Sequence, residues 1–435
     1  MRFVSTRNPK DVVSFEEAVF RGLAPDGGLY HPVERLDLAP LYERLGPEKG
    51  FVDVSYEMVR LLFGDEFSEE EAGRLVERAF PFSPVLRELT DSILLLELFH
   101  GPSCAFKDFG ASFLASCMEV FLSRREGRAV ILTATSGDTG SAVAQAFHGR
   151  RHIDVVILYP SGRVSPLQEK QLTTLGGNVH ALEVAGSFDD CQRMVKEAFL
   201  DQELSERCPL TSANSINLGR LVPQSFYYVW AYAQLKARGE RPFFCVPSGN
   251  FGNLTAGVYA WWWGMPVRGF LAATNVNDVV PEYLSTGVFT PRSSVRTLSN
   301  AMDVGNPSNF ERLLALFEGD HRRMAAVIRG ERVTDEETLD TIARYWRERG
   351  VFLDPHTAVG VKASERLLER ERGVAPVVTL ATAHPGKFLE VVEEALGIRP
   401  PLPPQLEEVL AKEKRAVKIP NTLEALKSFL LDLWG

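Results

Sequence analysis

PFFCVPSGNFGNLTAG (242–257) joins a short apolar run to a helix-like stretch through a loop with two glycines. The run PFFCV is typical of a strand buried on both faces, as in parallel α/β sheets. In the loop, Gly249, Gly252 and the amides around Asn250 and Asn253 make a small cradle for an anion at the positive end of a helix dipole. The loop is neither GxxxxGK[ST] nor GxGxxG, which argues against a nucleoside triphosphate or a dinucleotide. It therefore predicts a smaller phosphate-bearing ligand.

Short apolar runs alternate with longer helix-like stretches on both sides of this segment. This alternation predicts an α/β fold with a mainly parallel sheet. Strands are expected at ILLLELF (93–99), AVILTA (129–134), DVVILY (154–159), PFFCV (242–246) and VVTLA (377–381). Helices are expected between them at Asp108–Arg124, Gly140–Arg150, Phe188–Leu200 and Arg220–Arg238. In open parallel sheets ligands bind where strands end and helices begin, so the junctions after these strands are the candidate site.

The first 90 residues lack this alternation and are expected to be mostly helical. Ser14 with Glu17 and Ser68 with Glu71 match the capping-box spacing, in which a hydroxyl and a carboxylate satisfy free amides of the first helical turn. Near the other end, RPPLPP (399–404) predicts a rigid connector before a last pair of charged helices.

Composition and charge exclude several classes of protein. The chain has 435 residues and 45% hydrophobic content, and its net charge of −9 opposes binding to nucleic acid. No run approaches the ~18 apolar residues that span a bilayer, and the first residues lack the order of a secretory signal, so we expect a cytoplasmic protein that binds no membrane. The five cysteines contain no CxxC pair and are expected to be reduced core residues, without a metal site.

The junction HGPSCAFKDFG (100–110) places Lys107 after two apolar residues at an expected helix start. Desolvation and the helix dipole both lower the pKa of an ammonium group, which favours the free amine needed for a Schiff base with a carbonyl. Taken alone, the motif favours the interpretation of an ordinary solvated lysine.

Two further junctions carry polar groups to strand ends. In TATSGDTGSAVA (133–144), backbone amides and the hydroxyls of Ser136 and Thr139 are suited to bind a carboxylate or phosphate, although a plain turn with Asp138 as cap is an alternative. In TLATAHPGKF (379–388), a strand ends at Thr382 and brings its hydroxyl, with Lys387, to the same edge. Beside a phosphate cradle, this threonine hydroxyl could bond to a heteroaromatic nitrogen.

An amine, a phosphate cradle and a partner for a ring nitrogen on neighbouring strand ends are what pyridoxal phosphate requires. The chain resembles the threonine synthases, pyridoxal-phosphate enzymes whose fold is shared with the tryptophan synthase β chain and the serine/threonine dehydratases. The resemblance covers nearly the whole chain, in the family's order, through FVSTRN, SFEEAVFRGLAPDGGLYHP, HGPSCAFKDFG, SGDTG, SPLQEKQLTTLGG, NSINLGRLVPQSFYY, PSGNFGN, DVGNPSNFER, LDPHTAVG and ATAHPGKF.

The resemblance implies the fold of this family: two open α/β lobes with mainly parallel sheets, known as fold type II, plus a helical N-terminal segment. It implies that residues 1–90 form the N-terminal segment. Residues 91–106 and 216–435 would form the larger, cofactor-binding domain, and residues 107–215 the smaller one.

The resemblance also implies roles for single residues. Lys107 would hold pyridoxal phosphate as a Schiff base and then serve as the catalytic base. Thr382 would face the pyridine nitrogen, and Asp138 would lie near the ring's 3-oxygen, where related enzymes have an asparagine. A neutral hydroxyl at the ring nitrogen suits elimination and replacement more than transamination. The cofactor-binding set is completed by Gly249, Asn250, Phe251, Gly252 and Asn253.

The implied substrate is O-phosphohomoserine, whose phosphate needs a basic, hydroxyl-rich pocket. The substrate-binding candidates are Ser136, Thr139, Lys170, Asn214, Ser215, Asn217, Arg220 and Lys387, with Gln168, Asn306, Ser308 and Asn309 as further possibilities. For Lys170 an ordinary helix position is the alternative. His356 is open between an active-site role and that of a buried, satisfied histidine.

The implied activity is the conversion of O-phospho-L-homoserine and water to L-threonine and phosphate, the last step of threonine biosynthesis, by a monomer or weak homodimer. One alternative is a phospholyase relative that releases 2-oxobutyrate from the same substrate, and another is a cofactor-free scaffold. The sequence departs from the family pattern at Ser103, Cys104, Gly386 and Met302, none of which removes a group that the chemistry needs.

Overall fold

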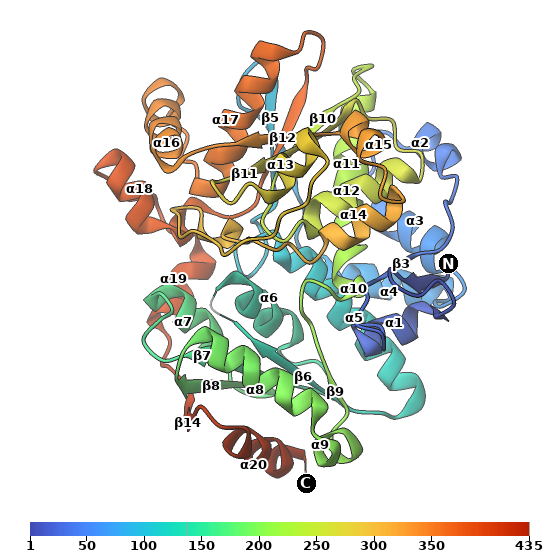
Figure 1. Cartoon of the computed structure of the whole chain (residues 1–435), viewed down its shortest axis with the longest axis vertical. Helices are drawn as coiled ribbons and strands as arrows, with labels where there is room; N and C mark the ends of the chain where they lie inside the picture. The colour runs from blue at the N-terminus through green and yellow to red at the C-terminus, as the bar shows by residue number, and fades with distance from the viewer. Residues whose placement is uncertain (136, 435) are drawn as a thin grey trace.

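The computed structural model describes residues 1–135 and 137–434, which form two α/β lobes with an N-terminal segment beside them (Figure 1). The larger lobe is built on a six-stranded sheet, in which β4 is antiparallel to β5 and the other neighbours are parallel. In spatial order its strands are β12 (Ile328–Arg332), β11 (Gly269–Thr274), β10 (Phe243–Pro247), β13 (Val377–Ala381), β5 (Ile93–Glu97) and β4 (Val85–Glu88).

The smaller lobe is built on a five-stranded sheet in which all neighbouring strands are parallel. In spatial order its strands are β14 (Val417–Pro420), β8 (Val179–Ala185), β7 (Ile153–Pro160), β6 (Ala129–Ala134) and β9 (Leu210–Thr211). Every strand predicted from an apolar run is present in one of the two sheets, and most of their residues are buried. The predicted α/β class with mainly parallel sheets is therefore confirmed.

Helices cover both sheets, as expected of parallel strands joined by crossovers. In the larger lobe α17 packs against β10, β11 and β13, and in the smaller lobe α8 packs against β6 and β7. The helices of the two lobes are α5 (Lys107–Arg125), α6 (Asp138–Phe147), α7 (Pro166–Thr173), α8 (Phe188–Leu200), α9 (Gln202–Arg207), α10 (Leu218–Leu221), α11 (Gln224–Lys236), α12 (Gly252–Trp262), α13 (Val279–Thr286), η1 (Asn300–Met302), α14 (Phe310–Leu316), α15 (His321–Val327), α16 (Asp335–Arg349), α17 (Pro355–Arg370), η2 (Pro385–Lys387), α18 (Leu389–Leu396), α19 (Pro404–Ala411) and α20 (Leu423–Trp434).

The N-terminal segment contains four helices and a small sheet. Both predicted capping boxes are formed, at Ser14 with Glu17 and at Ser68 with Glu71. The three-stranded antiparallel sheet was not predicted, because its strands have only two or three residues and show no alternation. The elements of the segment are β1 (Phe3–Ser5), β2 (Val12–Val13), α1 (Phe15–Arg21), β3 (Tyr30–Pro32), α2 (Ala39–Arg44), α3 (Phe51–Phe63) and α4 (Glu69–Ala79).

Two details differ from the sequence-based expectations. The helix expected over Arg220–Arg238 is divided into α10 and α11, with Pro223 at the N-terminal boundary of α11, where a residue without an N–H is tolerated. The last strand, β14, pairs with β8 of the smaller lobe, whereas 216–435 was expected to lie wholly in the larger domain. The chain thus returns to the smaller lobe after the Pro-rich connector.

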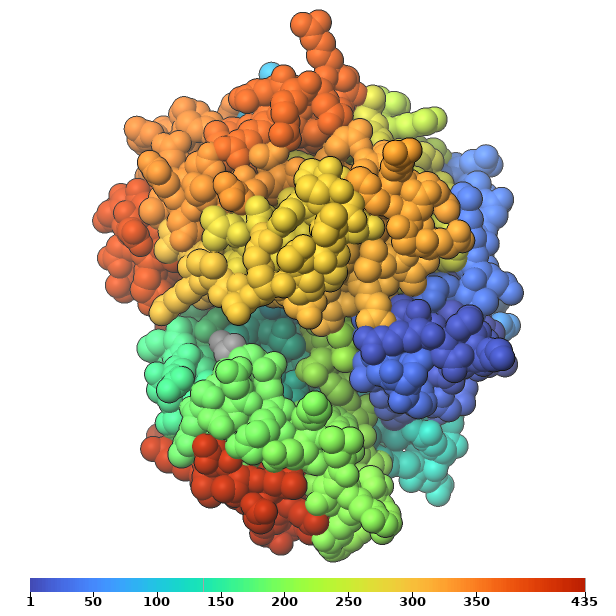
Figure 2. Space-filling view, viewed as in Figure 1, coloured from blue at the N-terminus to red at the C-terminus, as the bar shows by residue number. Residues whose placement is uncertain are grey.

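The space between the two lobes is the place where the predicted site residues should meet. The surface is hollowed there in Figure 2, below the yellow and orange surface of the larger lobe and above the green surface of the smaller one. Among the described residues, no helix is long and apolar enough to cross a membrane.

Candidate active site

The loop after β10 has the form of an anion cradle. β10 ends at Pro247, Phe251 adopts a left-handed φ of 61°, and α12 begins at Gly252 with no capping side chain among the described residues. The Leu254 N–H donates to Asn253 Oδ1 at 2.9 Å, so the amides of Gly252 and Asn253 are the ones open to an anionic ligand. A Cβ at Gly249 would lie 2.7 Å from the Ala301 carbonyl oxygen, so glycine is required for this close approach.

The two asparagine side chains of this loop maintain its shape. Asn253 Oδ1 accepts a hydrogen bond from Ser248 Oγ at 3.0 Å. Asn250 Nδ2 donates to Ser215 Oγ at 2.7 Å, and Asn250 Oδ1 accepts from the Ser308 N–H at 2.6 Å. These contacts tie the cradle to two segments predicted to bind substrate, and they leave phosphate binding to the backbone amides.

Lys107 and Thr382 are neighbours because the segment before α5 continues the larger sheet. β5 and β13 are parallel neighbours, and beyond their ends Phe106 N–H donates to the Thr382 carbonyl at 2.8 Å. Ala105 forms an isolated bridge with Ala383, and α5 then begins at Lys107. Since β13 also pairs with β10, Thr382 and the cradle follow adjacent strands at the same sheet edge.

The environment of Lys107 favours its neutral amine. Burial lowers the pKa of this amine below its ordinary value; the charge of Asp138 opposes the shift, while the charges of Arg220 and Lys387 add to it. The Nζ atom also lies 5.9 Å from the centroid of the Phe106 ring. The direction of the shift is the one predicted from the sequence, and it raises the fraction of amine that can attack a carbonyl.

Thr135 stabilises the turn before α6, a role that was not predicted from the sequence. Thr135 Oγ1 accepts hydrogen bonds from the N–H groups of Gly137 at 3.2 Å and Gly140 at 3.0 Å. Thr139 is half-buried on α6, and Ser136 lies outside the described residues. The available signal was a threonine directly after the apolar run, a residue type that favours helix caps and turns.

Asp138 and Lys387 form a buried ion pair between the lobes. Lys387 Nζ lies 2.7 Å from Asp138 Oδ1 and donates to the Ser103 carbonyl oxygen, also at 2.7 Å. Burial favours a raised pKa for Asp138, but the charges of Lys387 and Lys107 outweigh it and hold the pKa of this carboxyl well below its usual range. Asp138 is therefore ionised at neutral pH.

Arg220 provides a buried positive charge near Lys107. Its Nη1 donates to the Ala213 carbonyl at 2.7 Å, and among the described residues its buried Nε has no hydrogen-bond partner. Burial lowers the pKa of its guanidinium to about 10, which still leaves it charged at neutral pH. An unpartnered guanidinium N–H in a buried position is suited to an anionic group.

Asn214 and Ser215 lie on the segment that leads to α10. Asn214 Oδ1 accepts from Thr133 Oγ1 at 3.0 Å, at the end of β6. Ser215 contacts Asn250 of the cradle, as described above. The structure thus brings Ser215 to the cradle and Asn214 to the strand end that precedes α6.

The side chains of Asn217 and Lys170 have partners within the protein. Asn217 caps α10, because its Oδ1 accepts from the Gly219 N–H at 2.9 Å and its Nδ2 donates to the Val19 carbonyl at 2.8 Å. Lys170, which is half-buried on α7, donates to the carbonyl oxygen of Lys412. These contacts account for both side chains without a ligand.

His356 is a buried histidine whose two ring nitrogens are both hydrogen-bonded. Nε2 accepts from the Ala301 N–H at 3.2 Å, so the ring proton is on Nδ1, which donates to Asp354 at 2.8 Å. Through this bond to Ala301, His356 fixes the backbone segment that lies against Gly249. Of the two interpretations that the sequence left open, this geometry favours the buried, satisfied histidine.

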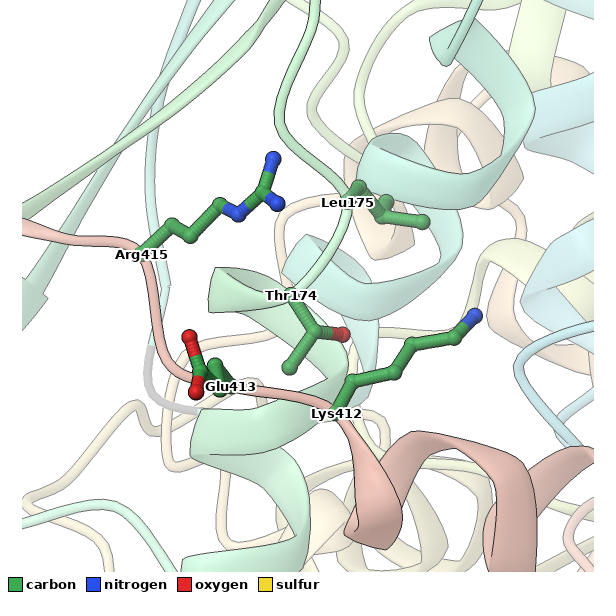
Figure 3. Close-up of a pocket in the computed structure, with 5 residues that line it drawn as sticks. All are labelled: Thr174, Leu175, Lys412, Glu413 and Arg415. Atoms are coloured by element: carbon green, nitrogen blue, oxygen red, sulfur yellow. The ribbon is translucent and has the colours of Figure 1, made fainter.

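A surface pocket lies apart from these groups, at the C-terminal end of α7. It is lined by Thr174, Leu175, Lys412, Glu413 and Arg415 (Figure 3), none of which was predicted to belong to the site. The described part of the chain contains no group of three or more His, Cys, Asp or Glu side chains that could hold a metal ion.

These observations fit pyridoxal phosphate. The cofactor needs an amine for its carbonyl carbon, amides for its phosphate and a polar partner for its ring, and the Lys107 amine, the uncapped start of α12 and Thr382 meet at one edge. The family model described as "Pyridoxal-phosphate dependent enzyme" matches residues 79–383. The protein is a pyridoxal-phosphate-dependent enzyme, and its cofactor is pyridoxal phosphate.

More specific matches cover both ends of the chain. The models "Threonine synthase N terminus" and "Threonine synthase, C-terminal" match residues 2–80 and 357–430. The chain belongs to the threonine synthase family.

Individual relatives agree with this assignment. Threonine synthase from Haemophilus influenzae is 42% identical over 99% of this chain and 100% of its own length. The crystal structure of the PLP-bound threonine synthase from Brucella melitensis superimposes with a TM-score of 0.94 at 37% identity, covering 100% of this chain and 99% of that one. The Escherichia coli enzyme superimposes with a TM-score of 0.89 at 40% identity, with full coverage of both chains.

Proposed function

We propose that the enzyme converts O-phospho-L-homoserine and water to L-threonine and inorganic phosphate. The observation that carries the proposal is the meeting of the Lys107 amine, Thr382 and the uncapped start of α12 at one edge of the larger sheet. Arg220, whose Nε has no hydrogen-bond partner in the part of the chain that the structure describes, supports a second anion in the site, as a phosphorylated amino acid requires. The relatives named threonine synthase support threonine as the product.

We assign the cofactor to residues on both lobes. Lys107 would bond to its carbonyl carbon, Thr382 would face its ring nitrogen and Asp138 would lie on the side of its 3-oxygen. When bound, pyridoxal phosphate supplies an electron sink for negative charge at the substrate carbon next to the amine. The phosphate would be held by the backbone of Gly249, Asn250, Phe251, Gly252 and Asn253.

Lys107 would perform the proton transfers. Once the substrate amine has displaced it, the side chain is a near-neutral amine that can take the proton from Cα and return it at the end. A second proton leaves Cβ and the Cγ–O bond breaks, which releases phosphate. Protonation at Cγ then completes the methyl group of threonine, and water adds its oxygen to Cβ. One water is consumed for each phosphate released.

The substrate would be held mainly by groups near the start of α10. The Arg220 guanidinium stays charged at neutral pH and would pair with the substrate phosphate, with Ser215 and Asn214 donating or accepting beside it. Ser136 and Thr139 remain proposed ligands at the start of α6. Asn217 and Lys170 are the weaker candidates, since their side chains already bond to Val19 and Lys412.

Product analysis tests the proposed reaction. The holoenzyme is incubated with O-phospho-L-homoserine in ¹⁸O-labelled water, and threonine, phosphate and 2-oxobutyrate are quantified by mass spectrometry. We expect threonine and phosphate in equal amounts, with the heavy oxygen in the threonine hydroxyl. Accumulation of 2-oxobutyrate without threonine would instead identify the phospholyase alternative.

Chemical reduction tests the assigned lysine. Borohydride treatment of the holoenzyme followed by peptide mapping should place the pyridoxyl adduct on Lys107. Lys107→Ala should lose both the adduct and the visible absorbance, while Lys170→Ala, a matched change on α7, should retain both. An adduct on any other lysine would contradict the assignment.

We also infer a monomer or weak homodimer in the cytoplasm. The five cysteines are all free and buried, which agrees with a reducing compartment. Sedimentation velocity over a range of protein concentrations would test the oligomeric state, and a stable tetramer would contradict it.

A further inference from the structure

The Asp138–Lys387 ion pair joins two residues that are deeply buried in the hollow between the lobes. The Lys387 side chain is 0% exposed and that of Asp138 is 6% exposed. A buried carboxylate and a buried ammonium are costly unless each has a partner, so neither group can be altered without affecting the other. Asp138 was expected to face the cofactor and Lys387 to bind substrate, but neither expectation includes the pair itself.

The position of Lys387 is fixed through the peptide groups of Ser103. The Ser103 carbonyl oxygen accepts from Lys387 Nζ at 2.7 Å and from Gln171 Nε2 on α7 at 3.1 Å. The Ser103 N–H donates to Asp108 Oδ2 at 2.9 Å. Asp108 directly follows Lys107 in α5, so the same short segment positions both lysines.

Asp138 acts on both lysines, but the structure pairs it with only one of them. Its charge raises the pKa of Lys107, and its ion pair, at 2.7 Å, is made with Lys387. A carboxylate paired with Lys107 instead would hold that side chain as an ammonium ion, which cannot attack a carbonyl. The partner that Asp138 has therefore determines whether the Lys107 amine is available.

We propose that Lys387 is a positioning residue for Lys107: by occupying Asp138, it prevents the carboxylate from pairing with Lys107 and leaves the Lys107 amine free to form its Schiff base. The inference rests on the proposed role of Lys107. It assigns Lys387 to the cofactor side of the site and not to the substrate. Other titratable groups around these residues are Arg220 from α10, near Lys107, Asp108 from α5, near Lys387 and Asp138, and His356 from α17, near Asp138.

The test measures the reactivity of the Lys107 amine in the full-length chain freed of cofactor. Trace acetylation with acetic anhydride at a series of pH values, followed by peptide mass spectrometry, gives the pH of half-maximal reactivity at Lys107. The exposed Lys418 serves as an internal reference in every sample. Circular dichroism and thermal unfolding establish that each variant is folded.

Lys387→Met should move the Lys107 profile to higher pH and reduce its reactivity at pH 7 at least tenfold, a shift of about one pKa unit. The double variant Lys387→Met/Asp138→Asn should return the profile towards that of the unaltered chain, because the competing carboxylate is gone. A loss of packing alone would not be reversed by the second substitution.

Three results would overturn the proposal: an unchanged profile in folded Lys387→Met, no return in the double variant, or a profile of Asp138→Asn that moves to higher pH. The last variant keeps the test decisive where Lys387→Met does not fold. A failure of the proposed function would look different, since borohydride would then fail to label Lys107 in the unaltered holoenzyme.

Discussion

Replacing Gly249 by alanine should weaken cofactor binding through a steric effect on the phosphate cradle. The new Cβ would lie 2.7 Å from the Ala301 carbonyl oxygen and 2.8 Å from Met302 Cα, and both are backbone atoms that cannot rotate away. Overpacking of this kind costs about 1–3 kcal/mol. If the loop moves to relieve it, the dissociation constant for pyridoxal phosphate rises roughly 5- to 150-fold.

The dissociation constant is measured by titrating the cofactor-free chain with pyridoxal phosphate and following visible absorbance. Gly252→Ala is the matched control in the same loop, since its Cβ would meet a side-chain atom, Asn309 Nδ2, at 3.3 Å. Gly73→Ala, whose Cβ meets nothing within 4 Å, controls for the substitution itself. Unchanged cofactor affinity in Gly249→Ala would refute the steric argument.

Three further predictions concern stability and the support of the site. Asn217→Ala removes the cap of α10 and the hydrogen-bond donor to the Val19 carbonyl. It should lower the free energy of unfolding, measured by urea titration, by about 1–3 kcal/mol. A loss smaller than that of exposed-surface variants would contradict this prediction. Burial, aided by the charge of Arg312, lowers the pKa of His31 to about 4, so its contribution to stability is present above pH 6.5 and is lost as the pH falls towards 4. Folded His31→Gln should therefore show a pH slope of stability in this window that is smaller by up to about 1.4 kcal/mol per pH unit, and an identical slope would exclude this histidine as its source. In Gly110→Ala the Cβ would lie 2.4 Å from the Arg220 carbonyl oxygen, so α5 and α10 must separate; we expect a raised KM for O-phosphohomoserine, and wild-type kinetics would show that the helices tolerate the change.

The strands of both lobes could be predicted because their residues form short, continuous apolar runs. Phe188–Leu200 was predicted with its exact bounds, since Ser187 caps it and Asp201 ends it. The strand Val417–Pro420 was missed because three of its four residues are exposed and show no buried run. This strand forms by pairing with β8, and local sequence patterns do not show such a contact between distant parts of the chain.

In the candidate site, too, the local features could be predicted from the sequence, whereas contacts between distant segments could not. The position and environment of Lys107 follow from a local motif, and its lowered pKa was predicted from apolar neighbours. The pairing of Asp138 with Lys387 could not be predicted, because it depends on how two lobes face each other. Asn217 was expected from the resemblance to bind substrate, yet its side-chain oxygen accepts a hydrogen bond from the Gly219 N–H at the start of α10.

The return of the chain to the smaller lobe has a consequence for its synthesis. β14 pairs with β8, but four of the six strands of the larger sheet, β10 to β13, are translated between them, which at about 5–20 residues per second takes on the order of ten seconds or more. During that time the outer edge of β8 has no neighbouring strand from its own chain and presents free backbone groups to other strands. The nascent smaller lobe is therefore exposed to aggregation from the time β8 leaves the ribosome until β14 does.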